Sequence, residues 1–146
     1  MVDRGVEVLS PQSAWDLLKS QNSAALVDVR SRAEWSFVGV PDLSPVGKQV
    51  VLAEWRSFPG MAVNPRFVEE LEEGMGDPPP SDILFICRSG ARSMEAATIT
   101  AERLNANGHA VRCHNVAEGF EGDLDAESHR GAVSGWKARG LPWRQS

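Results

Sequence analysis

The chain is poor in cysteine, and this scarcity excludes two classes of small protein. Its 146 residues contain only two cysteines and three histidines. Two cysteines cannot build the disulfide framework of a small secreted domain. A structural zinc site needs four cysteine or histidine ligands in close pairs, and Cys87, His109, Cys113 and His114 do not have that spacing. We therefore expect no bound metal, a reduced cytoplasmic setting and histidines that lie at the surface.

Long apolar runs and net positive charge are also missing. The longest apolar stretch near the N-terminus, Ala24 to Val27, is too short to span a bilayer, and Asp3, Arg4 and Glu7 interrupt any signal-peptide core. The net charge of -5 gives no general attraction for nucleic acid or for an anionic membrane. We expect neither as a partner. An anionic substrate would need a local positive site.

The remaining composition is that of an ordinary globular protein. Hydrophobic residues make up 42% of the chain and charged residues 24%. A chain of 146 residues is long enough to bury one hydrophobic core. We expect a single domain that spans residues 1–146.

Strand and helix patterns alternate along the chain. Strands are expected at residues 5–9, 24–29, 50–54, 83–86 and 110–113. Helices are expected after Ser10-Pro11, over 32–37, from Asn64-Pro65 to near Gly74, over 91–107 and over 133–139. This alternation predicts an α/β fold, with parallel βαβ units and a sheet covered on both faces. Ligands in such folds bind beyond the carboxyl ends of the strands, where Cys87 is expected to lie.

Residues 87–93, with the sequence Cys-Arg-Ser-Gly-Ala-Arg-Ser, connect the clearest strand to the longest helix. A loop that curves here would direct backbone N–H groups inward at the positive end of the helix dipole. Gly90 permits the tight curvature, and Arg88 and Arg92 add positive charge. Such a field favours the thiolate form of Cys87 and would hold a persulfide or an oxyanion. The alternative interpretation, a buried inert thiol, does not explain the two flanking arginines.

These residues resemble a known family. Cys87 to Ser93 is similar to the active-site loop of rhodanese-like single-domain sulfurtransferases. Residues 26–30, with Glu34-Trp35, resemble the family's earlier segment, and Gly135-Trp136 with residues 140–143 resemble its end. The resemblance implies a rhodanese-like three-layer α/β/α domain with a mainly parallel five-stranded sheet. It also implies that no organic cofactor is needed.

The same resemblance implies a reaction. Cys87 would be the catalytic nucleophile that takes a sulfane sulfur from thiosulfate or a similar small anionic donor. The resulting persulfide would pass that sulfur to a thiol, to cyanide or to a protein acceptor. The predicted substrate-binding residues are Arg88, Ser89, Gly90, Ala91, Arg92 and Ser93.

Two other functions stay open. A rhodanese-like module could bind an anion and regulate a partner without using the thiol. A phosphatase or an arsenate reductase would use a cysteine in a similar loop, but cysteine phosphatases carry Cys-x5-Arg. Counting from Cys87, Arg92 gives the shorter Cys-x4-Arg spacing, and Ser93 stands where a phosphatase would have its arginine.

Several residues outside the loop are candidates for supporting roles. We expect Asp28 behind the site, where it would bond loop N–H groups or an arginine, or else cap a helix. Arg30, four positions before Glu34, is expected to pair with it. Cys113 is interpreted as a core residue, with a resolving role against Cys87 as the alternative.

Two longer segments allow more than one interpretation. Trp55, Phe58 and Met61, from the segment 43–61, would either roof the site or pack elsewhere. An acidic stretch runs from Glu118 to Glu127, and we expect a solvated loop that could face a basic partner.

Overall fold

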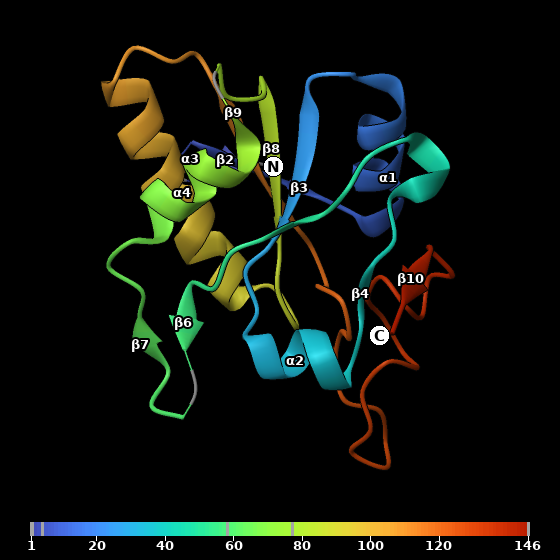
Figure 1. The fold of residues 1–146 in the computed structure, drawn as a ribbon. Coiled ribbons are helices and arrows are strands. Elements are labelled where there is room, and N and C mark those ends of the chain that lie inside the picture. The colour runs from blue at the N-terminus through green and yellow to red at the C-terminus, as the bar shows by residue number, and fades with distance from the viewer. Residues whose placement is uncertain (1, 4, 58, 77, 146) are drawn as a thin grey trace.

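One central sheet organises the molecule (Figure 1). The computed structural model describes residues 2–3, 5–57, 59–76 and 78–145. The strand order is β1 (Val2–Asp3), β2 (Val6–Leu9), β9 (Arg112–Val116), β8 (Asp82–Ile86), β3 (Ala24–Asp28) and β5 (Val51–Leu52). The five strands from β2 to β5 pair in parallel, and the short β1 pairs with β2 in antiparallel fashion. The predicted five-stranded parallel sheet is confirmed, with β1 added at its edge.

Helices cover both faces of this sheet (Figure 1). α1 (Pro11–Ser20) lies on one face, and α3 (Phe67–Met75) and α4 (Ala91–Ala106) lie on the other. Each face has its own apolar cluster: Leu26, Leu84 and Ile86 pack towards α1, while Val27, Ile83 and Phe85 pack towards α3 and α4. The three-layer α/β/α architecture is therefore confirmed.

Smaller elements complete the chain. They are α2 (Arg32–Phe37), the 3-10 turn η1 (Ser44–Val46), the pair β4 (Val40–Pro41) with β10 (Trp143–Arg144), and the hairpin β6 (Arg56–Ser57) with β7 (Ala62–Val63). None of the helices in the described ranges has both the length and the apolar character needed to cross a bilayer.

Local sequence explains why these elements form where they do. All five residues of β8 are buried, as expected for a central parallel strand. Ser10 caps α1 by accepting a hydrogen bond from the backbone N–H of Ser13. The small side chains of Ala96, Ala97 and Ala101 are buried where α4 lies against the sheet. These packed elements fix the loops that follow β3, β8 and β9 at one edge.

Three expectations about the fold are wrong in detail. Residues 133–139 form turns and not a helix, because Gly135 adopts a φ of 100°, outside the helical region. The last central strand continues to Val116, three residues beyond the predicted end. This extension places His114 inside the sheet, where it is buried and bonds Asp82, contrary to the surface position that we expected.

Candidate active site

Cys87 follows β8 directly, and its side chain is 1% exposed. Its Sγ accepts a hydrogen bond from the backbone N–H of Gly90 at 3.1 Å and lies 3.2 Å from the Ser93 Oγ. Gly90 has a φ of 118°, a conformation that favours glycine. The other side of Cys87 joins the apolar cluster beneath α4. The sulfur thus accepts from one backbone amide and has one hydroxyl beside it, fewer contacts than the several inward N–H groups that the sequence predicted.

Asn115 braces this loop from the neighbouring strand. Its Oδ1 accepts a hydrogen bond from the Ser93 hydroxyl at 2.5 Å, and its Nδ2 donates to the Gly90 carbonyl at 3.1 Å. Ser93 also lies 3.1 Å from the same carbonyl oxygen. The sequence reasoning missed Asn115 because it ended the strand at Cys113. The sequence does contain a signal for Asn115. Side chains alternate between the two faces along a strand, so in a longer β9 Asn115 faces the same side of the sheet as Cys113.

Arg92 forms a two-pronged ion pair with Glu34 of α2. The two contacts measure 2.7 and 2.9 Å, and both side chains are largely buried. Glu34 also accepts hydrogen bonds from Ser31 in a capping box. Burial alone would raise the pKa of Glu34, but hydrogen bonding and charge attraction from Arg92, with help from Ser31, lower it to about 2. The Arg92 guanidinium is therefore already paired with a carboxylate of this chain.

Asp28 and Arg30 form a separate and fully buried pair. The Arg30 Nη2 donates to Asp28 at 2.6 Å and to the Gly39 carbonyl at 2.6 Å. Its guanidinium also lies 4.2 Å from the centre of the Phe120 ring. The expected Arg30–Glu34 pair is wrong: the end of β3 turns Arg30 inward, and Glu34 faces Arg92 instead. Of the partners proposed for Asp28, the arginine is the one observed.

This buried pair supports the site without touching the sulfur. In the described parts of the chain, neither side chain hydrogen bonds to residues 87–93. Arg30 instead joins the ends of β3, β4 and the turn after β9, because it contacts Asp28, Gly39 and Phe120.

A tight turn after β9, residues 119–122, forms backbone hydrogen bonds with the cysteine loop. The N–H of Phe120 donates to the Cys87 carbonyl at 2.7 Å, and the N–H groups of Glu121 and Gly122 donate to the Arg88 carbonyl at 3.0 and 3.1 Å. A Cβ atom at Gly119 would lie 2.5 Å from the Arg88 carbonyl oxygen, so this close approach requires glycine. This role of Gly119 was not predicted from the sequence.

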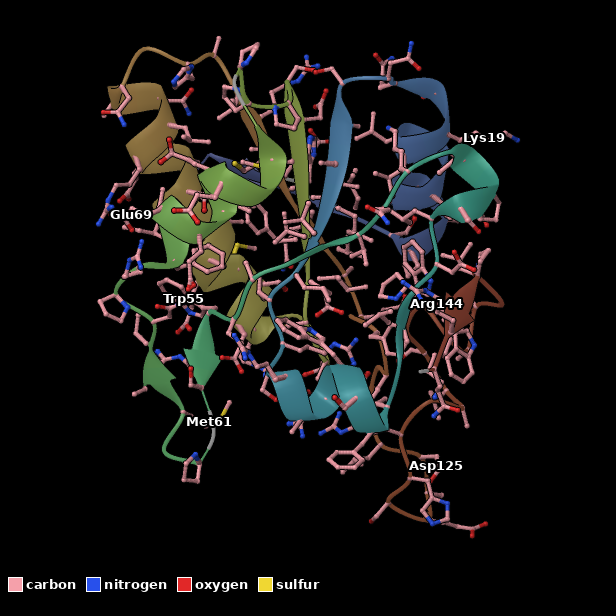
Figure 2. The ribbon with its side chains drawn as sticks, viewed as in Figure 1. Lys19, Trp55, Met61, Glu69, Asp125 and Arg144 are labelled. Carbon is pink, nitrogen blue, oxygen red and sulfur yellow. The ribbon has the colours of Figure 1, made fainter. Side chains whose placement is uncertain are left out.

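The remaining loop residues lie outward. Arg88, Ser89 and Ala91 are exposed. A cavity of about 300 Å³ opens beside them and is lined by Glu34, Val38, Met61, Arg88, Arg92, Glu121 and Arg130. Cys87 itself does not line this cavity; we call the cavity the mouth of the candidate site because Arg88 and Arg92 of the cysteine loop line it. Of the residues proposed as a roof, Met61 lines the mouth, from the hairpin beside α2 (Figure 2).

Trp55 and Phe58 have different outcomes. Trp55 packs edge-on against Phe67 and donates to Glu95, so it packs elsewhere. Phe58 lies outside the described residues.

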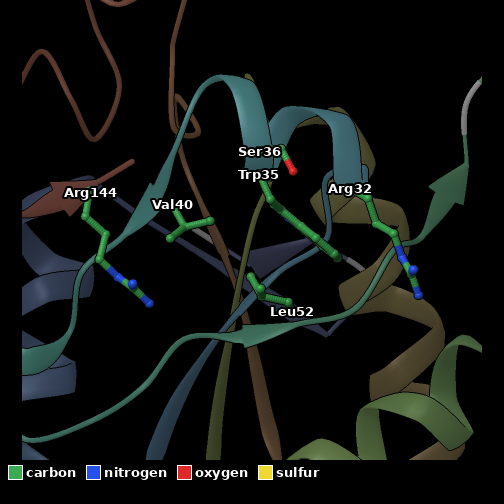
Figure 3. Close-up of a pocket in the computed structure, with 6 residues that line it drawn as sticks. All are labelled: Arg32, Trp35, Ser36, Val40, Leu52 and Arg144. Atoms are coloured by element: carbon green, nitrogen blue, oxygen red, sulfur yellow. The ribbon is translucent and has the colours of Figure 1, made fainter. Parts of the chain in front are cut away.

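A second cavity lies on the other side of α2. Its volume is about 430 Å³, and its lining residues are Arg32, Trp35, Ser36, Val40, Leu52 and Arg144. Figure 3 shows Trp35 extending from α2 towards Leu52, with Arg32 and Arg144 at opposite ends. No residue of the cysteine loop lines this cavity, so it lacks the nucleophile.

The other cysteine does not belong to the mouth. Burial raises the pKa of the Cys113 thiol to about 12, with a further contribution from Asp82. Cys113 and Cys87 are both free thiols. The described residues contain no group of three or more side chains arranged to hold a metal ion.

Comparison with known proteins assigns the family. Residues 10–126 match the Rhodanese-like domain. An uncharacterized protein of Rickettsia conorii, RC0915, is 34% identical over 95% of this chain and 98% of its own. The crystal structure of Rv0390 from M. tuberculosis is 46% identical, with a TM-score of 0.83 over 97% of this chain and 98% of its own.

A more distant structure shares the fold. The polysulfide-sulfur transferase of Wolinella succinogenes is 21% identical, with a TM-score of 0.58 over 97% of this chain and 80% of its own. The fold, the loop between β8 and α4 and the family match over 117 residues agree. This chain belongs to the rhodanese-like domain family.

Proposed function

We propose that this protein is a sulfurtransferase that carries a sulfane sulfur on Cys87. The observation that carries the proposal is the position of the Cys87 sulfur, which follows β8 and accepts a hydrogen bond from the Gly90 amide at 3.1 Å. That amide lies at the start of α4, where a negative charge on sulfur is favoured.

The reaction has two displacement steps. In the first, the Cys87 thiolate attacks the outer sulfur of thiosulfate, the sulfur–sulfur bond of the donor breaks, and sulfite leaves with the bonding electron pair. In the second, an acceptor thiolate or cyanide attacks the outer sulfur of the Cys87 persulfide. This second step restores the Cys87 thiolate. Each step conserves charge and needs no external oxidant or reductant.

The loop residues have different parts in this scheme. The Gly90 amide stabilises the negative sulfur, because its N–H donates to the sulfur at 3.1 Å. The Ser93 hydroxyl lies 3.2 Å from the sulfur, but it donates its hydrogen to Asn115 and would have to turn away from Asn115 to donate to the sulfur. Arg88, exposed at the mouth, attracts the anionic donor. Arg92 contributes its charge at a distance, since its hydrogen bonds are made to Glu34. Ser89 and Ala91 shape the outer wall of the loop.

The burial of Cys87 favours a second candidate, an anion-binding regulatory module in which the thiol is not used. A side chain that is 1% exposed must become accessible before it can react. A phosphatase or arsenate reductase activity is less well supported, because the loop has the Cys-x4-Arg spacing and Arg92 is already paired.

Intact-mass measurement after thiosulfate treatment separates these candidates. We expect the protein to gain the mass of one sulfur atom, and we expect a reducing agent to remove it. Cys113→Ser should gain the same mass, and Cys87→Ser should gain none while keeping its fold by circular dichroism. If the unmodified protein gains no sulfur from thiosulfate or from polysulfide, the sulfurtransferase proposal fails and the binding module is favoured.

A further inference from the structure

We propose that Arg130, together with Arg88, forms an anion-binding subsite at the mouth and that this subsite selects negatively charged sulfur donors. The inference rests on the sulfurtransferase function proposed above, in which Arg88 attracts the anionic donor, and it adds Arg130 as a residue that selects that donor. Arg130 lies beyond residues 10–126, the part of the chain that matches the family.

Hydrogen bonds to the turn at residues 119–122 hold Arg130 in position. Its Nη1 donates to the Gly122 carbonyl at 2.6 Å, and the next residue, Gly131, donates its N–H to the Glu121 carbonyl at 2.8 Å. The segment before it closes on Asp125, whose Oδ1 accepts from two backbone N–H groups of the same loop. Asp125 marks the outer part of this loop in Figure 2. Arg130, three residues beyond the acidic stretch from Glu118 to Glu127, therefore adds a cation to the lining of the mouth.

The charges at the mouth are unevenly paired. Three guanidiniums and two carboxylates line the cavity, and Arg92 and Glu34 neutralise each other. Arg88 and Arg130 have no carboxylate within 4.0 Å in the described parts of the chain. Glu121 is the remaining carboxylate in the lining, and among the described residues it forms no ion pair. Two unpaired cations in a space of about 300 Å³ repel each other, and a bound anion would relieve this repulsion.

Guanidinium chemistry suits an oxyanion. Each arginine has five N–H donors in a planar fork that matches paired oxygen atoms. The Gly122 carbonyl engages one Nη of Arg130, so donors remain for a ligand. The sulfonate end of thiosulfate, or the sulfite that leaves, presents three such oxygens. An anion held between the two arginines would contact the residue that directly follows Cys87 in the chain.

A matched pair of alkylating reagents tests the subsite without sulfur transfer. Iodoacetate and iodoacetamide both react with a thiolate by displacing iodide, and they differ in charge. We compare their rates at Cys87, read from the mass of its peptide, in Arg130→Gln and in the unmodified protein. The ratio of the two rates cancels any change in the reactivity or exposure of the thiol.

We expect Arg130→Gln to lower the ratio of iodoacetate to iodoacetamide rates on the order of fivefold, and to raise the KM for thiosulfate on the order of tenfold. Glu121→Gln should shift both quantities the opposite way, because it removes the opposing charge. Arg66→Gln is the control, since Arg66 is an exposed arginine of α3's N-terminal end and should change neither.

Each outcome has a defined meaning. An unchanged ratio in Arg130→Gln overturns the subsite, and so does an equal fall in both rates, which indicates a merely structural role. If the unmodified protein accepts no sulfur, the proposed function fails, and the alkylation ratio still decides whether the subsite exists.

Discussion

The buried pair of Asp28 and Arg30 gives the sharpest test of how the site is held in place. Both side chains are fully buried, and their charged atoms lie 2.6 Å apart. Removal of one partner from such a pair leaves an uncompensated buried charge, which costs about 3–5 kcal/mol. Arg30→Ala also removes the contacts with Gly39 and Phe120, each worth about 1 kcal/mol. We therefore expect Arg30→Ala to lower the free energy of unfolding by about 5–7 kcal/mol.

A double-mutant cycle isolates the interaction. We expect Asp28→Ala to cost about 3–5 kcal/mol, and the double variant to cost less than the sum of both by about 2–3 kcal/mol. Urea unfolding followed by tryptophan fluorescence supplies the free energies. If Arg30→Ala does not fold, Asp28→Asn, which keeps the side-chain shape, provides the measurement.

The control is an exposed pair, Arg103 with Glu69, whose charged atoms are 4.0 Å apart. Arg103→Ala should cost less than about 1 kcal/mol. A loss below about 1 kcal/mol in Arg30→Ala, or full additivity in the cycle, would refute the idea that this pair holds the three loop ends together.

Three further expectations concern the loop and its supports. Because the pKa of Glu34 in the folded protein, about 2, lies below its ordinary 4.5, its pair with Arg92 stabilises the protein above about pH 4.5, and this stability is lost as the pH falls towards 2. Glu34→Gln should flatten the decline of the urea midpoint between pH 5 and pH 2, and an unchanged slope would contradict this. Gly119→Ala should cost more than about 2 kcal/mol, because its Cβ would overlap the loop backbone, whereas Gly47→Ala, with positive φ and open space, should cost only about 1 kcal/mol. Equal losses in these two variants would show that the overlap is relieved. Asn115→Ala leaves buried groups of the loop unpaired, so it should lower the free energy of unfolding by about 1–3 kcal/mol and slow persulfide formation. Thermal unfolding measures the first effect and intact mass the second. Unaltered values would contradict the role of Asn115 in holding the loop.

The local parts of the site could be predicted from the sequence because their signals are short-range. The apolar run at Ile83–Ile86 followed by Cys87, Gly90 and an alanine-rich helix identifies a strand, a loop and a helix in sequence order. Parallel βαβ units then place the cysteine at the carboxyl edge of the sheet. The structure has these elements where the pattern indicated.

The contacts between distant segments could not be predicted in the same way. Arg92 meets Glu34 across 58 positions of sequence, while the i,i+4 rule pointed to Arg30, which lies before the first turn of α2 and turns inward. Asn115 was missed because Arg112, His114 and Asn115 interrupt the apolar pattern of β9. Burial of those polar groups depends on partners that a single strand does not contain, such as Asp82 for His114.

The turn at residues 119–122 holds the cysteine loop through main-chain atoms alone. Two side chains at the mouth also make structural contacts, because Arg92 pairs with Glu34 and Arg130 donates to the Gly122 carbonyl. We expect a substitution at Glu121 or Arg130 to change which anions are attracted, while the backbone bonds from residues 120–122 keep the cysteine loop in place. The charge of the mouth can therefore change while the backbone that holds the cysteine loop stays the same. Relatives with different residues at these two positions would accept sulfur donors of different charge.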